Sequence, residues 1–303
     1  MSAIRMEGVT KRYGEVTALD GLDLTVESGE IFGFLGPNGA GKSTAIGLML
    51  EFIEPTRGTV EVLGRDVERR GQEVRARTGV LPEAFGVYDR LTGRQHVEFA
   101  VESKGADDDP HELLERVGVA DAADRKAGGY SKGMRQRLAL AMALTGSPDL
   151  LILDEPTTGL DPGGAREVRK IIRQERDRGA TVFFSSHVLE QVEAVCDRVG
   201  ILRDGQLVAV DAIDALRTAA GGGSRLRITV DGATEAAAAA VRDVAGVSAA
   251  TVDGGALSIT CDADAKLRAL NAVEDATGVA DFETVETSLE DLFLSYTAEE
   301  VPA

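Results

Sequence analysis

The stretch that decides the fold of this 303-residue chain is Gly36-Pro37-Asn38-Gly39-Ala40-Gly41-Lys42-Ser43-Thr44, residues 36–44. Its glycines let the backbone curl so that successive N–H groups point into one concavity, where the following helix adds a dipole that favours an anion. Apolar residues 30–35 predict a buried strand before the loop, and residues 44–52 predict a helix after it. The stretch therefore predicts a phosphate-binding loop, in which Lys42 reaches the β- and γ-phosphates and the Ser43 hydroxyl ligates Mg²⁺. The alternative is a glycine-rich turn with a chance lysine, which the fit of both flanks disfavours.

The second signal is an acidic pair at the end of an apolar run. Residues 150–153 are four consecutive aliphatics, which predict a strand buried on both faces, and Asp154 and Glu155 follow directly. Side chains at this end of a strand lie at the edge of an open α/β sheet, where ligands bind. We expect Asp154 to hold Mg²⁺ through its water shell and Glu155 to polarise an attacking water.

Two further strand ends carry weaker signals. His187 lies just past the apolar run 181–186, on the same edge as Glu155, so a functional role is favoured although a lone histidine is more often structural. Glu83 follows a short predicted strand, and a carboxylate at that place is usually a solvated cap.

Tyr13 and Ser131 each admit two interpretations. Tyr13 lies in the turn between two predicted antiparallel strands, 3–10 and 16–26, and it either stacks on adenine or is a half-buried surface tyrosine. Ser131 and Gly133 stand at the mouth of a predicted helix, where N–H groups can bind phosphate or Ser131 can simply cap the helix.

Composition limits the class of protein. Hydrophobic residues make up 43% of the chain, as in ordinary globular proteins, and no apolar run approaches the ~20 residues of a membrane-spanning helix. The N-terminal residues lack the apolar core of a secretion signal, so we expect a cytosolic protein. Cys196 and Cys261 are the two cysteines, without metal-ligand spacing, and we expect inert thiols. A formal charge of −18 argues against nucleic acid as the main partner.

The balance of charged residues also indicates the kind of organism from which the protein comes. The chain has 51 acidic residues, and only 7 of its 33 basic residues are lysine. Abundant carboxylates with scarce lysine are typical of proteins from salt-accumulating halophiles, which predicts a halophilic archaeon as the source. A GC-rich genome would also favour arginine, alanine and glycine but would not require the excess of acid.

Together these segments resemble the nucleotide-binding subunit of an ABC transporter. The resemblance covers about residues 3–220 and rests on motifs in a fixed order, which are the phosphate loop, Tyr130-Ser131-Lys132-Gly133-Met134-Arg135-Gln136, the strand acids, Gly159-Leu160-Asp161 and His187. It implies an α/β P-loop ATPase domain at 1–220, with a mixed sheet covered by helices on both faces, an antiparallel β subdomain and a helical subdomain at about 91–145.

The resemblance also implies roles for individual residues. Tyr13 would stack on adenine, Glu155 would be the general base, and His187 would sense the γ-phosphate. The predicted nucleotide-binding set is Tyr13, Gly36, Pro37, Asn38, Gly39, Ala40, Gly41, Lys42, Ser43, Thr44, Ser131, Gly133, Met134 and Asp161. The predicted catalytic residues are Glu155, His187 and Lys42, and the predicted Mg²⁺ ligands are Ser43, Asp154 and Glu83.

Two positions depart from the common family pattern. Glu83 stands where the family usually has glutamine, and Tyr130-Ser131-Lys132-Gly133-Met134 replaces the usual Leu-Ser-Gly-Gly-Gln signature. Both variants resemble the branch that serves multidrug, antibiotic-resistance, sodium and polysaccharide exporters. The acid at 83 can still contact Mg²⁺ or a water, but its metal role is less secure than those of Ser43 and Asp154.

A second domain is predicted at 221–303. After a helix near 211–219 and the linker Ala219-Ala220-Gly221-Gly222-Gly223-Ser224, the pattern predicts strands and helices in the order β-α-β-β-α-β, that of a small α+β ferredoxin-like module. A last helix is predicted from Ser288 to Tyr296. This region carries 15 acidic and 5 basic residues, so anionic lipid would repel it. We expect it to regulate or to dimerise.

The resemblance finally implies partners. Two copies would pair in the presence of ATP and Mg²⁺, with Ser131 and Gly133 of each copy reaching the ATP of the other. The pair would power export by a separate integral membrane permease at the inner face of the membrane, without inserting into it and without nucleic acid.

The alternative is a soluble ATPase of this fold that acts on DNA or ribosomes. The short spacing of 112 positions from Lys42 to Asp154 and the single copy of each motif disfavour it. A binding module that has lost hydrolysis is disfavoured because Glu155 and His187 are both present.

Overall fold

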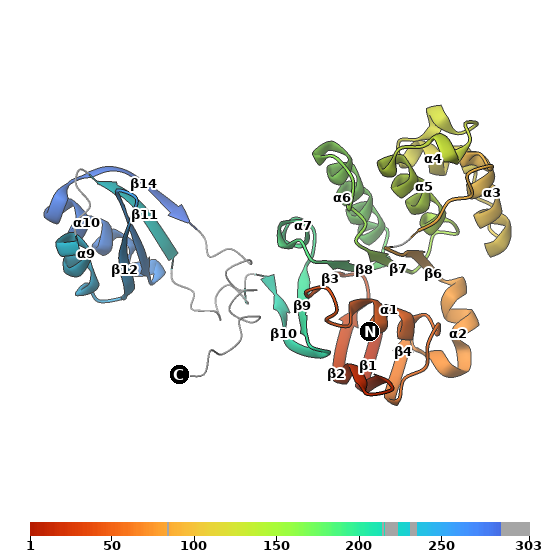
Figure 1. Ribbon diagram of the computed structural model, residues 1–303, viewed down its shortest axis with the longest axis horizontal. Helices are drawn as coiled ribbons and strands as arrows, with labels where there is room; N and C mark the ends of the chain where they lie inside the picture. The colour runs from red at the N-terminus through yellow and green to blue at the C-terminus, as the bar shows by residue number, and fades with distance from the viewer. Residues whose placement is uncertain (84, 214, 216–223, 231–234, 286–303) are drawn as a thin grey trace. The chain divides into compact units, whose positions relative to one another are not determined.

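The chain separates into two units in the computed structural model, which describes residues 1–83, 85–213, 215, 224–230 and 235–285 (Figure 1). The first unit is Met1–Ala212, and the second begins at Ile213. The boundary expected between residues 220 and 221 lies outside the described residues. The helix expected at 211–219 is wrong at its start, because residues 211 and 212 end a strand, and most of its remainder lies outside the description.

A six-stranded sheet forms the centre of the first unit. In spatial order it contains β10 (Gln206–Ala212), β9 (Arg198–Arg203), β3 (Ile31–Leu35), β8 (Thr181–Ser186), β7 (Leu150–Asp154) and β6 (Thr78–Leu81). All neighbours from β9 to β6 run parallel, and β10 is the antiparallel edge. Every residue of β3, β7 and β8 is buried, as expected for apolar runs in strands covered on both faces. Because these strands are parallel, the segments that follow them meet at one edge.

A second, antiparallel sheet packs beside the first. Its spatial order is β2 (Val16–Glu27), β1 (Ser2–Tyr13), β4 (Arg57–Val62) and β5 (Arg65–Asp66). The pairing of β1 with β2 confirms the two strands predicted at the N-terminus. Ile4, Phe34 and Leu48 belong to one core cluster that joins both sheets to α1 (Lys42–Met49). This shared core fixes the loop between β3 and α1.

Helices cover both faces of the six-stranded sheet, as expected. Phe32 and Phe34 face the core that contains α1. On the other face, a Cβ at Gly33 would meet Val192 of α7 (Leu189–Glu193), and α6 (Pro162–Asp177) contacts β3 and β8. The unit also contains α2 (Val67–Ala76).

Three helices form the subdomain expected at about 91–145, and Figure 1 shows them grouped together. They are α3 (Gly93–Lys104), α4 (Pro110–Arg116) and α5 (Lys132–Leu144). Thr92 caps α3 in a capping box with Gln95, and Asp109 caps α4. These caps fix where the chain turns between the helices. Among the described residues no helix has the length and apolar character needed to cross a bilayer.

The second unit has the predicted β-α-β-β-α-β order. Its elements are β11 (Ser224–Val230), α9 (Glu235–Arg242), β12 (Val247–Asp253), β13 (Ala256–Cys261), α10 (Lys266–Thr277) and β14 (Val279–Val285). The sheet order β12-β13-β11-β14, with every pair antiparallel, is that of a split βαβ fold. Alternate residues of β11, Leu226 and Ile228, form its core with Val241 and Val273 of the helices. The helix predicted from Ser288 to Tyr296 lies outside the described residues.

Candidate functional site

The loop between β3 and α1 has a backbone that only glycine tolerates. Gly41 adopts φ +111°, and a Cβ there would lie 2.6 Å from the carbonyl oxygen of Ala18. Gly39 also lies in the left-handed region, at φ +86°. α1 begins at Lys42, two residues before the predicted start, so its N-terminal N–H groups lie directly behind the loop. The loop therefore has the geometry of an anion site at a helix N-terminus.

Lys42 spans the inside of the loop. Its Nζ donates to the carbonyl oxygens of Gly36 at 2.7 Å and Pro37 at 3.2 Å, and the residue is only 8% exposed. Burial lowers the pKa of Lys42 from its usual value, and the opposing influence of three nearby carboxylates is smaller. A buried ammonium held by carbonyl dipoles is positioned to interact with an anion in the loop.

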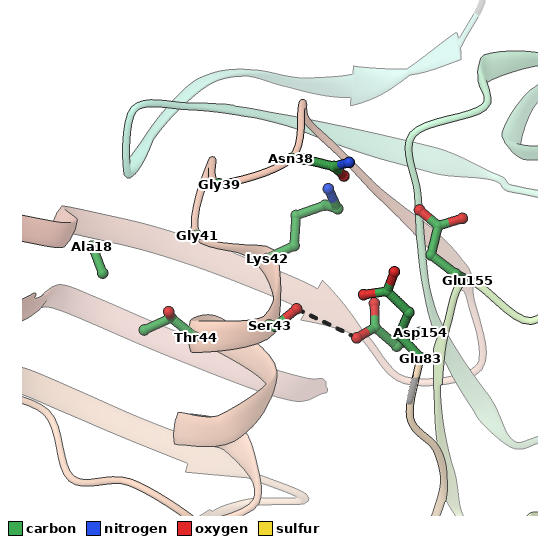
Figure 2. Close-up of a pocket in the computed structure, with 10 residues that line it drawn as sticks. All are labelled: Ala18, Asn38, Gly39, Gly41, Lys42, Ser43, Thr44, Glu83, Asp154 and Glu155. Atoms are coloured by element: carbon green, nitrogen blue, oxygen red, sulfur yellow. Dashed lines mark hydrogen bonds between the residues drawn. The ribbon is translucent and has the colours of Figure 1, made fainter. Parts of the chain in front are cut away.

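One cavity of about 260 Å³ collects most of the predicted phosphate, metal and catalytic residues (Figure 2). It is lined by Ala18, Asn38, Gly39, Gly41, Lys42, Ser43, Thr44, Glu83, Asp154 and Glu155. The structure thus brings together the loop, the acids that follow β7 and the acid that follows β6. Gly36, Pro37 and Ala40 belong to the same loop but do not line the cavity.

The side chains of Asp154 and Ser43 bring two oxygen atoms together in the wall of the cavity. The Ser43 hydroxyl lies 3.5 Å from Asp154 Oδ2, while the hydroxyl of Ser185 on neighbouring β8 donates to Oδ1. Asp154 is therefore held in place with one oxygen turned to Ser43. Mg²⁺ prefers oxygen ligands and is usually held by one or two protein groups together with waters and phosphate oxygens. The donor set fits that mode, and within the described residues no cluster of three His, Cys, Asp or Glu could hold a metal by itself.

Glu155 is strained and tightly held. It adopts φ +50°, which is rare for a residue other than glycine, and it is 4% exposed. Its Oε1 accepts the backbone N–H of His187 at 2.8 Å and lies 2.6 Å from His187 Nδ1, while the hydroxyls of Thr158 and Ser186 lie 3.4 Å from Oε2. A neutral His187 in this contact carries its proton on Nδ1. The carboxylate therefore has one oxygen fixed by the histidine and one with only long contacts.

Tyr13 stands apart from this group. It ends β1, its ring is 49% exposed, and the Nζ of Lys11 lies 5.0 Å from the ring centroid. It does not line the cavity, whereas Ala18 of β2 does. The predicted stacking on adenine stays a prediction.

The signature segment lines a different cavity, of about 390 Å³. Its lining residues are Ser131, Lys132, Gly133, Met134, Arg137, Gly159, Leu160 and Asp161. Ser131 caps α5 by accepting the N–H of Met134 at 3.2 Å, and Asp161 caps α6 by accepting that of Gly164 at 3.0 Å. In one chain, therefore, the phosphate loop and the signature segment line two separate cavities.

Several residues that hold the acids were not predicted from the sequence. Ser185 and Ser186 fix Asp154 and Glu155, and a pair of serines at the end of an otherwise apolar strand was the available signal. Thr158 carried no signal, because its place beside Glu155 depends on the turn after β7.

Comparison with known proteins identifies the family. The family model described as ABC transporter matches residues 19–158. A daunorubicin resistance ATP-binding protein of Streptomyces coeruleorubidus is 36% identical over 310 residues, which span 99% of this chain and 97% of that protein. This chain belongs to the ABC transporter family. A linearmycin resistance ATP-binding protein of Bacillus subtilis is 32% identical over 97% of the chain and 98% of its own length.

The solved structures agree with the family assignment. The ATP-binding subunit of an ABC transporter matches with a TM-score of 0.68 and 28% identity, over 73% of this chain and 94% of that one. The fold is thus the P-loop ATPase of ABC proteins, and the chain is an ATP-binding ATPase of the family. The relatives give no support to the alternative of an ATPase acting on nucleic acid or ribosomes. The relatives named above are bacterial, so they do not show the expected halophilic archaeal origin.

Proposed function

We propose that two copies of this ABC protein enclose two ATP molecules and hydrolyse them to drive export through a separate integral membrane permease. One observation carries the proposal: the lysine and serine of the phosphate loop and the two acids at the end of β7, Asp154 and Glu155, line a single cavity. The signature residues line another cavity, which is consistent with their contacting the nucleotide of a second copy.

ATP binding would begin at the loop. Phosphate oxygens would accept hydrogen bonds from the backbone N–H groups of the loop and of the start of α1. They would also replace the carbonyl oxygens of Gly36 and Pro37 as hydrogen-bond acceptors of Lys42. Tyr13 would stack on the adenine. Ser43 and Asp154 would hold Mg²⁺, with Glu83 nearby, and bound Mg²⁺ supplies charge neutralisation at the phosphates.

Hydrolysis would depend on Glu155. Its Oε2, which has only long contacts, would accept a proton from a water as that water attacks the γ-phosphorus and the bond to the β-phosphate oxygen breaks. His187 would hold Oε1 and contact the γ-phosphate, while Lys42 stabilises the charge of the transferring group. Phosphate and ADP would then leave, and the two copies would separate.

An apolar hollow of about 600 Å³ supplies a surface for the permease. It is lined by Phe85, Gly86, Tyr88, Arg90, Leu91, His96, Phe99 and Met142, and we name it the docking groove. Tyr88 is 70% and Phe99 is 61% exposed, which makes the groove an apolar patch on a charged surface. It lies in the region where the family resemblance places the coupling helix of the membrane subunit. We propose that this contact keeps the chain at the cytoplasmic face of the membrane.

The names of relatives indicate the kind of cargo. Besides the daunorubicin and linearmycin proteins, a fluoroquinolones export ATP-binding protein of Mycobacterium tuberculosis is 41% identical over 75% of this chain. We propose that this chain energises export of a drug or an antibiotic, and that residues 221–303 form a regulatory or dimerising domain.

The test is co-expression with the integral membrane permease that serves as its partner. Inside-out vesicles should accumulate daunorubicin or a fluoroquinolone when ATP and Mg²⁺ are added, and vesicles with Glu155→Gln should not. Transport that is equal in the two preparations would overturn the proposal.

The acid excess supports a further proposal, adaptation to high salt in a halophilic archaeal host. Salt screens the mutual repulsion of carboxylates, so the folded state should gain stability between 0.1 and about 2 M KCl. Thermal unfolding over that range is the measurement. A melting temperature that does not rise would contradict the proposal.

A further inference from the structure

Residues 85–91, which supply five of the residues that line the docking groove and are here named the groove loop, are joined by backbone hydrogen bonds to the turn before α5. The carbonyl of Asp89, in the groove loop, accepts the N–H of Gly128 at 3.1 Å, and the carbonyl of Leu91 accepts that of Ala127 at 2.8 Å. Thr92 and Lys126 form an isolated β-bridge beside them. The groove loop and the turn before α5 therefore form one hydrogen-bonded unit.

Gly128 is a point of close approach between the two segments. A Cβ at this position would lie 2.9 Å from the carbonyl oxygen of Asp89 and 3.0 Å from its Cβ. Because one of these atoms belongs to the backbone, a side chain at position 128 requires the two segments to separate. Conversely, a shift of the groove loop at Asp89 displaces Gly128, three residues before Ser131.

Arg135 joins both segments to the signature helix. Its Nη2 donates to the Gly128 carbonyl at 3.0 Å and lies 3.7 Å from Asp89 Oδ1. Its backbone N–H donates to the carbonyl oxygen of Ser131 at 3.0 Å. Asp89 is 71% exposed, so the ion pair itself is weak, and the charge-assisted bond to Gly128 is the stronger contact. The Nε of Arg135 is buried and has no hydrogen-bond partner within the described residues. The guanidinium thus gives up one hydrogen bond while it bridges the groove loop, the turn and the helix.

We infer that Arg135 is a positioning residue that couples the docking groove to the placement of Ser131 against the ATP of the second copy. The inference rests on the proposed function, since it takes the signature segment as the contact with that ATP. A coupling between two sites is reciprocal, so ATP-driven pairing must change the groove just as groove occupancy changes the pairing. This allows a test without the permease.

The test measures, in the full-length chain, how fast a cysteine placed in the docking groove is chemically modified. Phe99→Cys places a thiol in the groove, and Glu155→Gln prevents ATP turnover. The native Cys261 is buried and burial strongly raises the pKa of Cys196, so the chain without Phe99→Cys gives a low background. We expect ATP and Mg²⁺ to change the rate of N-ethylmaleimide modification at position 99 by at least about fivefold, in the usual range of coupling between sites. Arg135→Met should reduce that ratio to below about twofold.

Matched variants separate coupling from a merely structural role. Arg135→Lys keeps a cationic donor within reach of Gly128 and should recover at least half of the parent ratio. Arg94→Met removes another arginine of the subdomain, one that pairs with Asp124 at 2.8 Å and does not contact Gly128, and it should leave the ratio unchanged. Should Arg135→Met fail to fold, Gly128→Ala provides the second test, because its Cβ separates the same segments.

Light scattering on the same samples distinguishes a failure of the proposed function from a failure of this inference alone. If ATP produces no dimer, the proposed function fails and the inference fails with it. If dimers form but the parent modification rate does not respond to ATP, or Arg135→Met and Gly128→Ala respond like the parent, the inference alone is overturned. A loss of response in both variants, with recovery in Arg135→Lys, supports it.

Discussion

The cavity behind the phosphate loop and the cavity at the signature differ in how far one chain completes them. In the first, Lys42, Asp154 and Glu155 are all at least nine-tenths buried, and neighbouring groups fix each of them. In the second, Ser131 is exposed and its hydroxyl already caps α5. The comparison indicates that one chain preorganises the chemistry, whereas the signature offers an exposed helix end, which in the proposed function meets the ATP of a second chain.

The largest expected effect is on the acid of the preorganised cavity. Glu155→Gln removes the proton acceptor and keeps the shape, so turnover should fall about 10²- to 10⁴-fold, the usual contribution of a general base. ATP affinity should remain within about threefold. Phosphate release measures turnover, and Glu167→Gln on exposed α6 is the control. Turnover that persists in Glu155→Gln would move catalysis to another group.

The next effect concerns binding at the same cavity. Lys42→Ala removes a buried cation from the phosphates, so ATP affinity should weaken by at least about 30-fold, the usual cost of truncating a buried charge pair. Titration with a fluorescent ATP analogue measures the affinity. Lys170→Ala, which removes an exposed lysine, should change nothing. An unchanged affinity in Lys42→Ala would remove this residue from the phosphate site.

A substitution at the signature should leave ATP affinity intact and impair turnover. Gly133→Asp adds a negative charge in the first turn of α5, which suits the helix but repels a phosphate of the second copy. Turnover should fall at least about tenfold, while the monomer binds ATP as before. Gly133→Ala, whose Cβ meets Leu160 at 3.2 Å and the Gly159 carbonyl oxygen at 3.7 Å, separates the effect of an added side chain from that of the charge and should lower turnover less than Gly133→Asp. A loss of monomer affinity in Gly133→Asp would show that the two cavities are not separate sites.

The smallest effect tests the cap. Ser131→Ala leaves the Met134 N–H without its side-chain partner and should lower the free energy of unfolding by about 1 kcal/mol. Ser131→Asn keeps a capping oxygen and should retain most of the stability. Urea denaturation measures both. Equal stability of the three proteins would contradict the cap assignment.

The parts of the fold predicted from sequence are those with strong local signals. The strands around the phosphate loop have continuous apolar runs, and Thr92 and Asp109 are recognisable caps. The β-α-β-β-α-β order of the second unit followed from alternation and glycine turns. These elements depend on residues close together in the chain.

The elements left unassigned have weak local signals. α2 is rich in arginine and glutamate, has three buried residues and contains a non-helical Arg70, so no apolar period marks it. α7 has only five residues, and β9 and β10 find their places by pairing with β3 and with each other. The early start of α1 depends on the left-handed Gly41, because no side chain caps that helix. Long-range pairing thus decides β9 and β10, whereas the start of α1 depends on the backbone conformation of one glycine.

The candidate site divides in the same way. The phosphate loop and the strand acids could be predicted, since parallel strands bring their ends to one edge. The group that holds Asp154 could not, because Ser185 meets it across 31 positions of sequence. The contact between Arg135 and Asp89 could not be predicted either, because it depends on the packing of the helical subdomain. Sequence motifs thus predicted the candidate catalytic and binding residues, whereas the structure was needed to find the residues that hydrogen-bond to them and hold them in place.

The most direct test of whether two copies pair around ATP is the mass of the Glu155→Gln protein in solution. Size-exclusion chromatography with light scattering should give the mass of one chain without nucleotide and twice that mass with ATP and Mg²⁺. Adding Gly133→Asp to the same protein should return it to the single-chain mass. A protein that binds ATP to saturation yet keeps the mass of one chain would contradict the account.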